Sequence, residues 1–280
     1  MSDANILSAV LHRGVGRLRE MRNGRRDAQV VLLRVLGCDG AWLLAHPEMK
    51  LSDEQARQYD EWIARRAHNE PLQYILGEQE FYGLMLRVTP DVLIPRPETE
   101  HLVEAVLERV PKDAAVRILD VGTGSGAIAV ALAHRLAQAQ VTAVDVSEAA
   151  LEIARQNAVA HEVAGRITFL KSDLLAAVRG ERFHVVVSNP PYVANGEILE
   201  AQVRLYEPRE ALFAGPTGLE VFRKLIPQSR EALVVGGWLL MEIGHGQLDA
   251  VAGLLADWDG VRFIDDLQAI PRVAIAQRRG

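Results

Sequence analysis

The sequence predicts an α/β domain with a mostly parallel sheet, preceded by a small helical domain. From about residue 98 onward, β-branched apolar runs alternate with helical patterns, which is typical of parallel strands joined by crossover helices. Residues 3–76 contain only short helical patterns. The length of 280 residues suits one large or two ordinary domains, and a hydrophobic content of 49% indicates a water-soluble globular protein.

The helical part contains two well-marked helices. Residues Asp27–Leu36 carry apolar side chains at helical spacing and end at Gly37, a good C-cap. Ser52–Gln55 is a capping box that opens a second helix. Pro71 then interrupts the helical pattern. We therefore predict a helical domain over residues 1–76.

Residues 77–97 are predicted to connect the two domains. The segment Phe81–Val88 alternates between apolar and polar residues around a central glycine, which favours a β-hairpin. Leu93–Glu98 places an arginine between two prolines, so it should be stiff and extended. The second domain is then expected over residues 98–280.

Seven strands are predicted in this second domain, each a short apolar run rich in β-branched residues. They cover Arg117–Val121, Val141–Asp145, Ile167–Lys171, Phe183–Ser188, Trp238–Ile243, Arg262–Ile264 and Val273–Gln277. The main helical patterns between them cover Ile128–Leu136, Glu148–Ala160 and Leu219–Leu233. Ligands of such sheets bind at the carboxyl ends of the strands, near the switch in strand order.

The composition argues against several classes of function. No apolar stretch approaches the length of a membrane span and the polar N-terminus lacks a signal-peptide pattern, so we expect a cytoplasmic protein. The single cysteine, Cys38, forms no internal disulfide, which fits a reducing compartment. With one cysteine and scattered histidines, we expect no metal site.

The charge is unevenly distributed. A net charge of −6 argues against direct binding of duplex nucleic acid, which requires a basic face. Residues 1–90 are neutral, so the remaining residues carry the excess acid. Within the neutral part, Glu20 is the single acid among six arginines: Arg13, Arg17, Arg19, Arg22, Arg25 and Arg26. This Arg-rich segment is either a solvated helix face or a contact surface for an acidic protein or RNA.

The most informative motif stands at the end of the fourth strand. Asn189-Pro190-Pro191-Tyr192 follows the strand directly, and the prolines end the sheet ladder because they have no N–H to donate. The side-chain oxygen of Asn189 and the carbonyl of Pro190 can accept both protons of an NH₂ group. Tyr192 can lie flat behind that group. The alternative is a rigid turn with a structural aromatic ring.

Three other strand ends carry candidate ligand-binding residues. The first strand ends in Asp120 and a glycine-rich loop, in which the backbone can approach a ligand closely. The loop residues are Gly122, Thr123, Gly124, Ser125 and Gly126. Asp145 ends the second strand and is placed to bind a ribose diol, which suits NAD and S-adenosylmethionine equally well. After the third strand, Asp173 can accept the amine of adenine while Leu174 covers the ring.

The combination of the four strand ends distinguishes these ligands. A nicotinamide enzyme has no need of the Asn-Pro-Pro-Tyr motif, whereas a methyltransferase acting on an NH₂ group does. We therefore expect S-adenosylmethionine as the cofactor and S-adenosylhomocysteine as its product. Structural roles stay open, because Asp120 can hold the glycine turn and Asp145 and Asp173 can cap the helices that follow. Such roles do not predict the shared placement at strand ends.

These motifs resemble a known family. The Asp120–Gly126 loop, Asp145 and Asn189–Tyr192 are similar to class I S-adenosylmethionine-dependent methyltransferases that methylate amino groups. The run Leu93–Glu100 more closely resembles the protein-(glutamine-N5) methyltransferases that modify translation release factors. Supporting motifs are Gly77–Gly83, Tyr206–Pro208 with Ala211-Leu212, and Glu242–Gly244 followed by Gln247. The resemblance extends from about Asp27 to the C-terminus.

The resemblance implies a class I methyltransferase fold and a substrate. That substrate is the glutamine of the Gly-Gly-Gln motif in class I peptide chain release factors, which the helical domain helps to hold. Asn189, Pro190 and Tyr192 would be catalytic, with Asn189 also near the cofactor. The substrate-binding residues would be Asn189, Pro190, Pro191, Tyr192, Arg96 and Glu242. Arg96 can alternatively pin Glu98 or the cofactor-side loop, and Glu242 can hold a neighbouring loop.

Two other functions are compatible with parts of the pattern. An N6-adenine or N2-guanine methyltransferase acting on nucleic acid can use the same Asn-Pro-Pro-Tyr motif, although the acidic second domain argues against it. A non-catalytic S-adenosylmethionine-binding scaffold is the other alternative. Asp145, Asp173 and the Asn-Pro-Pro-Tyr motif are all intact, which argues against a non-catalytic scaffold.

Overall fold

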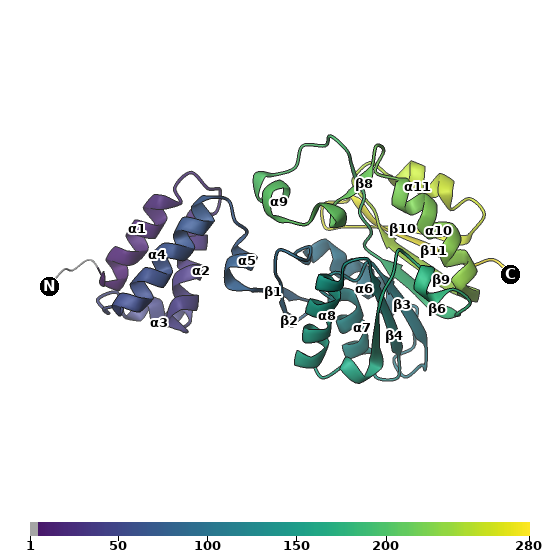
Figure 1. The fold of residues 1–280 in the computed structure, drawn as a ribbon, viewed down its shortest axis with the longest axis horizontal. Coiled ribbons are helices and arrows are strands. Elements are labelled where there is room, and N and C mark those ends of the chain that lie inside the picture. Colours follow the sequence, from purple (N-terminus) through teal and green to yellow (C-terminus); the bar gives the residue numbers. More distant parts are fainter. Residues whose placement is uncertain (1–4) are drawn as a thin grey trace. The chain divides into compact units, whose positions relative to one another are not determined.

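The computed structural model describes residues 5–280 and contains two compact units (Figure 1). The smaller, helical unit extends up to Gly77 and also includes Glu200–Tyr206. The larger unit comprises Glu78–Leu199 and Glu207–Gly280. The sequence did not predict that the segment after Leu199 belongs to the helical unit.

The helical unit is built on a core shared by its longer helices. Its helices are α1 (Leu7–Arg17), α2 (Gly24–Leu36), α3 (Gly40–Ala45), α4 (Asp53–Ala67), α5 (Leu72–Leu76) and α9 (Ala201–Tyr206). Val10 of α1, Val31 of α2 and Ile63 of α4 are fully buried together in this core. Gly37 ends α2 in the left-handed conformation, and the Ser52–Gln55 capping box forms both of its hydrogen bonds.

Ion pairs connect the helices of this unit. Arg66 of α4 donates to Asp27 of α2 over 2.7 Å, and both side chains are largely buried. Arg13 and Arg17 of the Arg-rich segment lie 3.5 and 3.9 Å from the carboxylate of Asp60. These two arginines therefore contribute to the contact between α1 and α4. A role of the segment in binding a partner stays a prediction.

A hairpin begins the larger unit. Strands β1 (Glu78–Phe81) and β2 (Leu84–Arg87) pair antiparallel across a two-residue turn, as the sequence predicted. Their apolar side chains join the core of the larger unit. The proline-flanked segment then leads into a 3₁₀ turn, Pro97–Thr99, and helix α6 (Glu100–Leu107). Thr99 is buried at this junction, with 4% of its surface exposed.

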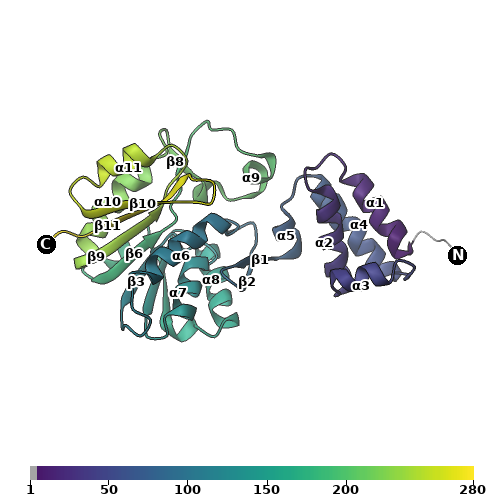
Figure 2. The same ribbon diagram turned by 180° about the vertical axis from the view of Figure 1, so that it is seen from behind.

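A seven-stranded sheet of order β10-β11-β9-β6-β3-β4-β5 forms the centre of the larger unit (Figures 1 and 2). The strands are β3 (Arg117–Val121), β4 (Gln140–Asp145), β5 (Ile167–Lys171), β6 (Phe183–Ser188), β9 (Leu233–Glu242), β10 (Asp259–Asp265) and β11 (Pro271–Gln277). Only β11 runs opposite to the other six strands of this sheet, so the predicted mostly parallel sheet is confirmed. The strand order reverses beside β3, which is where such sheets bind ligands.

Helices cover both faces of this sheet. On one face lie α6, α7 (Ala127–Arg135) and α8 (Glu148–Ala160), packed with the hairpin. The other face carries α10 (Glu220–Ala232) and α11 (Leu248–Leu254), as Figure 2 shows from behind. Shorter elements complete the unit: β7 (Val193–Ala194), β8 (Phe213–Gly215) and 3₁₀ turns at Ala164–Arg166, Ala176–Val178 and Arg209–Ala211.

The clearest difference from the predicted strands concerns β9. It begins at Leu233, whereas the sequence predicted a start at Trp238. Two consecutive glycines, Gly236 and Gly237, weaken the strand pattern there, and the pairing of β9 with β6 shifts register in the same region. Among residues 5–280, no helix is long and apolar enough to cross a membrane. No group of three or more His, Cys, Asp or Glu side chains in that range is arranged to hold a metal ion.

Candidate active site

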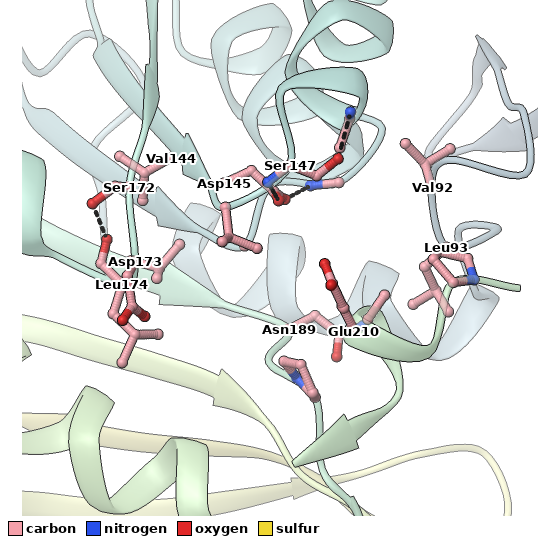
Figure 3. Close-up of a pocket in the computed structure, with 18 of the residues that line it drawn as sticks. Val92, Leu93, Val144, Asp145, Ser147, Ser172, Asp173, Leu174, Asn189 and Glu210 are labelled. Carbon is pink, nitrogen blue, oxygen red and sulfur yellow. Dashed lines mark hydrogen bonds between the residues drawn. The ribbon is translucent and has the colours of Figure 1, made fainter.

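A cavity of about 280 Å³ lies at the carboxyl ends of β3, β4, β5 and β6 (Figure 3). We call it the strand-end cavity. Each of the four strand ends singled out in the sequence contributes to its wall. The predicted residues that line it are Gly122, Gly124, Asp145, Asp173, Leu174, Asn189 and Pro191. Loop residues without a predicted ligand-binding role close the opposite side: Asp91, Val92, Leu93, Pro208, Glu210 and Ala211.

The glycine-rich loop after β3 has two faces. Gly122 and Gly124 line the cavity with φ of +74° and +54°, and a Cβ atom on either would meet no protein atom within 4 Å. The missing side chains therefore leave room for a ligand against the backbone. Gly126 faces the protein instead, because a Cβ there would lie 2.9 Å from the Cβ of Ala154 in α8. Thr123 and Ser125 are buried and do not line the cavity.

Asp120 lies beneath the loop and does not line the cavity. Its side chain is fully buried, and its Oδ2 accepts a hydrogen bond of 2.7 Å from the Thr123 hydroxyl. Its Oδ1 has no hydrogen-bond partner among residues 5–280. Burial raises the pKa of Asp120 to about 7, although the Thr123 hydroxyl and the Ala129 amide oppose the rise. The contact with Thr123 shows that Asp120 holds the glycine turn, the structural role left open in the sequence.

Asp145 presents a carboxylate to the cavity at the end of β4 (Figure 3). Its Oδ2 accepts from the amide of Gly124 at 2.8 Å, and its Oδ1 accepts from the amide of Ser147 at 2.9 Å. Burial raises the pKa of this carboxyl above its ordinary value, while the backbone amides of Ser147, Gly124 and Val146 favour the charged form. Each oxygen keeps a lone pair for a ligand hydroxyl. Ser147, not Asp145, caps α8 by accepting from Ala150.

The wall beside β5 is formed by a strained turn. Leu174 has a φ of +48°, which is rare for a residue other than glycine. The Ser172 hydroxyl stabilises this conformation by donating to the Leu174 carbonyl at 2.8 Å and accepting from the Ala177 amide at 3.0 Å. Strain of this kind, of order 1–3 kcal/mol, persists where surrounding contacts enforce it, often at binding sites. The turn places Asp173 and Leu174 side by side on the cavity wall (Figure 3).

The acceptor motif after β6 is held by a chain of four side chains, which we call the acceptor network. Asn189 donates through Nδ2 to the Thr99 hydroxyl at 3.0 Å. The Thr99 hydroxyl donates to Oε2 of Glu242 at 2.6 Å, and the Tyr192 hydroxyl donates to Oε1 of Glu242 at 3.1 Å. Among residues 5–280, no donor contacts Oδ1 of Asn189. The amide oxygen is therefore available at the wall of the cavity.

Tyr192 is fixed at both ends. Besides its hydroxyl bond to Glu242, its backbone carbonyl accepts from Nε2 of Gln247 at 2.9 Å. Gly244 packs so closely that a Cβ atom there would lie 3.0 Å from the tyrosine ring. Burial raises the pKa of Tyr192, and the neighbouring Glu242 carboxylate adds to the effect. Pro190 and Tyr192 do not line the strand-end cavity, whereas their neighbours Asn189 and Pro191 do.

Arg96 contacts a buried acid that the sequence did not single out as a partner. Its guanidinium lies 2.5 Å from Oε1 of Glu207, whose side chain is 1% exposed. The other oxygen of Glu207 accepts from the amide of Ile94 at 3.2 Å. These bonds join the Val92–Leu93 wall of the cavity to the Pro208–Ala211 wall. Of the roles predicted for Arg96, holding a loop beside the strand-end cavity is the one that these contacts favour.

Several residues of the site were missed in the sequence because their partners are distant along the chain. Thr99 lies 90 residues before Asn189, and Glu207 lies 111 residues after Arg96. Asn157 of α8 ties the glycine-rich loop to the hairpin by donating to the carbonyls of Ser125 and Arg87. Thr99 and Glu207 lie within the motifs Leu93–Glu100 and Tyr206–Pro208, which were the available signal.

Two family models match the chain. One describes a PrmC N-terminal domain and matches residues 9–77. The other describes a methyltransferase small domain and matches residues 99–208. The two matches correspond to the helical unit and to the part of the larger unit that carries the four strand ends.

Similar proteins cover almost the whole chain. A release factor glutamine methyltransferase of Koribacter versatilis is 49% identical over 91% of this chain and 91% of its own length. The release factor glutamine methyltransferase of Escherichia coli is 40% identical over 95% of this chain and 97% of its own length. Among solved structures, the 16S rRNA N2 G1207 methyltransferase of T. thermophilus, in complex with AdoMet and guanosine, has a TM-score of 0.55. It is 20% identical and covers 72% of this chain and 50% of its own, so the likeness concerns the fold alone.

Proposed function

The chain belongs to the family of release factor glutamine methyltransferases, and from this we propose that it methylates the side-chain amide nitrogen of the Gly-Gly-Gln glutamine in a class I peptide chain release factor. The methyl donor in this proposal is S-adenosylmethionine. One observation carries the proposal: Asn189 presents an unpartnered amide oxygen at the wall of a cavity whose other residues suit a nucleoside. Because release factors act in translation, we place the reaction in the cytoplasm.

The residues of the strand-end cavity fit S-adenosylmethionine. Asp145 offers carboxylate lone pairs to the two ribose hydroxyls, and Gly122 and Gly124 leave open space against the backbone. Asp173 can accept from the exocyclic amine of adenine, while Leu174 covers the ring. When bound, this cofactor supplies a methyl group on a positively charged sulfur. The acidic wall formed by Asp145 and Asp173 complements that positive charge.

The acceptor residues address the weak nucleophilicity of an amide. The lone pair of an amide nitrogen is delocalised into its carbonyl, so the nitrogen must be held accurately to react. Oδ1 of Asn189 and the carbonyl of Pro190 can accept the two N–H protons of a glutamine, which fixes the nitrogen and raises its electron density. Tyr192 then holds the plane of the amide. Positioning of this kind contributes at most about 7–11 kcal/mol to a reaction.

The proposal is tested by following the label from S-adenosylmethionine labelled in its methyl group. We expect incorporation into a class I release factor and none when the glutamine of its Gly-Gly-Gln motif is replaced by Glu or Ala. Purified RNA and DNA are incubated in parallel. Label that enters nucleic acid while the release factor stays unlabelled would refute the proposal and favour a base methyltransferase.

Variants of the enzyme separate cofactor binding from transfer. We expect Asn189→Ala to lower turnover by about 10²-fold or more, as for loss of one well-placed group at a reacting centre, with little change in cofactor affinity. Thr168→Val serves as a control that should leave turnover unchanged, because Thr168 is an exposed residue of β5 that does not line the cavity. An equal loss of cofactor affinity and turnover in Asn189→Ala would make Asn189 a cofactor ligand instead.

A further inference from the structure

The number of protons available in the acceptor network fixes the direction of its hydrogen bonds. A carboxylate has no proton, so both oxygens of Glu242 act as acceptors. Each receives one hydroxyl proton, from Thr99 at 2.6 Å and from Tyr192 at 3.1 Å. A threonine hydroxyl has a single proton, and Thr99 uses it in the hydrogen bond that it donates to Glu242. Thr99 can therefore only accept from Asn189, which must turn its NH₂ group towards Thr99.

This direction decides what Asn189 shows to a substrate. With Nδ2 committed to Thr99 at 3.0 Å, the side-chain oxygen is the atom left for the cavity. The reversed amide would present an NH₂ group to the NH₂ group of a substrate glutamine, and two donors cannot bond to one another. An asparagine alone does not choose between these orientations, because its two ends are nearly identical in shape.

The surroundings of Glu242 keep this arrangement isolated from water. Thr99 is 4% exposed and Glu242 is 2% exposed, so water does not compete strongly for their hydrogen bonds. Burial raises the pKa of Glu242 and the charge of Glu98 adds to the effect, while the Thr99 and Tyr192 hydroxyls and the charge of Arg272 of β11 favour the carboxylate. The charges of Arg96 and Arg272 partly offset the rise that burial and Glu242 cause in the pKa of Tyr192.

We infer that Thr99 and Glu242 are positioning residues that hold the Asn189 amide with its oxygen towards the acceptor nitrogen. Neither needs to touch the substrate for this role, which replaces the direct substrate contact predicted for Glu242. The inference rests on the proposed function, because it assigns the Asn189 oxygen to a substrate amide. It also accounts for the threonine in the Leu93–Glu100 motif, whose hydroxyl points into the network and not into the cavity.

The test compares two changes at Thr99 in the full-length protein. Thr99→Val removes the hydroxyl with little change in shape, and Thr99→Ser keeps it. We expect Thr99→Val to lower kcat for release-factor methylation by about tenfold, the effect of losing one buried hydrogen bond, with KM for the release factor and cofactor affinity nearly unchanged. Thr99→Ser should restore most of the rate. Thr168→Val repeats the same chemical change at an exposed position outside the network.

A double-variant comparison shows whether Thr99 acts through Asn189. In an Asn189→Ala background, Thr99→Val should cause no further loss of kcat, because the amide that it positions is absent. A purely structural role of Thr99 would instead lower the rate by the same factor in both backgrounds. Equal and additive losses would therefore overturn the inference, as would a Thr99→Val variant with the kcat of the parent.

A second readout does not depend on methyl transfer. The side-chain NH₂ signals of Asn189, identified by their loss in Asn189→Ala, can be followed by ¹⁵N NMR. We expect Thr99→Val to shift these signals and speed their exchange with water, while Thr99→Ser leaves them near their original positions. Unchanged signals in Thr99→Val would refute the positioning role. Failure of the unaltered protein to label any release factor would refute the proposed function, and the NMR result would still decide the geometry.

Discussion

The two faces of the glycine-rich loop can be separated by a matched pair of substitutions. Gly124 and Gly126 both have positive φ, of +54° and +81°, so alanine at either costs about 1–2 kcal/mol of backbone strain. They differ in what the new Cβ meets. At Gly124 there is no protein atom within 4 Å, whereas at Gly126 the Cβ and Cα of Ala154 lie at 2.9 and 3.1 Å.

The size of the difference follows from these contacts. Ala154 lies in α8 and its Cβ is rigidly attached to the helix, so Gly126→Ala must displace the helix or the loop. Overpacking of this kind adds about 1–3 kcal/mol to the strain. We expect Gly126→Ala to be less stable than Gly124→Ala by that amount, or roughly 2–10 °C in melting temperature. Gly124→Ala should instead weaken S-adenosylmethionine binding, because its methyl group enters the cavity.

Thermal unfolding without cofactor and calorimetric titration with S-adenosylmethionine measure the two effects. The expected result is a crossed pattern, in which one variant loses mainly stability and the other mainly affinity. If Gly124→Ala binds S-adenosylmethionine as tightly as the parent, the loop does not contact the cofactor at this position. If the two variants unfold at the same temperature, the close packing of Gly126 against α8 carries no energetic weight.

Three further changes test the charged groups around the site. Burial raises the pKa of Asp120 to about 7 in the folded protein, from 3.8 for a free side chain. Between these two pH values the folded state therefore binds one more proton than the unfolded state. The free energy of unfolding should then fall by at most about 4 kcal/mol as the pH rises from the lower to the higher value. Asp120→Asn should abolish this slope in urea unfolding measured from pH 4 to 7. Arg96→Met should lower the free energy of unfolding by about 1–3 kcal/mol, because it leaves Glu207 buried without its partner. This value is smaller than for a fully buried ion pair because the Arg96 side chain is 33% exposed. An unchanged midpoint of urea unfolding would contradict this expectation. Burial raises the pKa of Glu242, so this carboxylate should become protonated at a higher pH than an ordinary glutamate. As the pH is lowered, kcat at saturating cofactor should fall at that higher pH. The kcat of Thr99→Val should not show this fall, because its Asn189 is no longer linked to Glu242.

Much of the fold could be predicted because its signals are local. The strands β3, β5 and β6 and helix α8 have the predicted bounds, since each is a short run with one clear period. Helix α9 could not be assigned to the helical unit in this way. It is six residues long and its contacts there are distant along the chain, such as the bond from the Tyr206 hydroxyl to the carbonyl of His68.

The same contrast between local signals and distant contacts applies to the candidate site. Its cofactor half consists of residues at the ends of consecutive strands, and topology alone brings Gly124, Asp145 and Asp173 to one cavity. The acceptor half depends on pairs that no period or spacing reveals. Thr99 and Glu242 are 143 residues apart, and their bond exists only because the 3₁₀ turn before α6 packs against the end of β9.

Two deeply buried acids of the larger unit, Asp120 and Glu242, show why such partners matter more than burial itself. Asp120 and Glu242 are exposed by 0% and 2%, yet their oxygens have different partners. One oxygen of Asp120 has no hydrogen-bond partner among residues 5–280, and the other accepts from the Thr123 hydroxyl, which can donate to this carboxyl whether or not it is charged. Both oxygens of Glu242 receive hydroxyl protons, and these two bonds together with the charge of Arg272 favour the carboxylate against the opposing effect of burial. A neutral group at Glu242 would bring a donor to a place where both neighbours already donate, and the orientation of Asn189 would be lost with it.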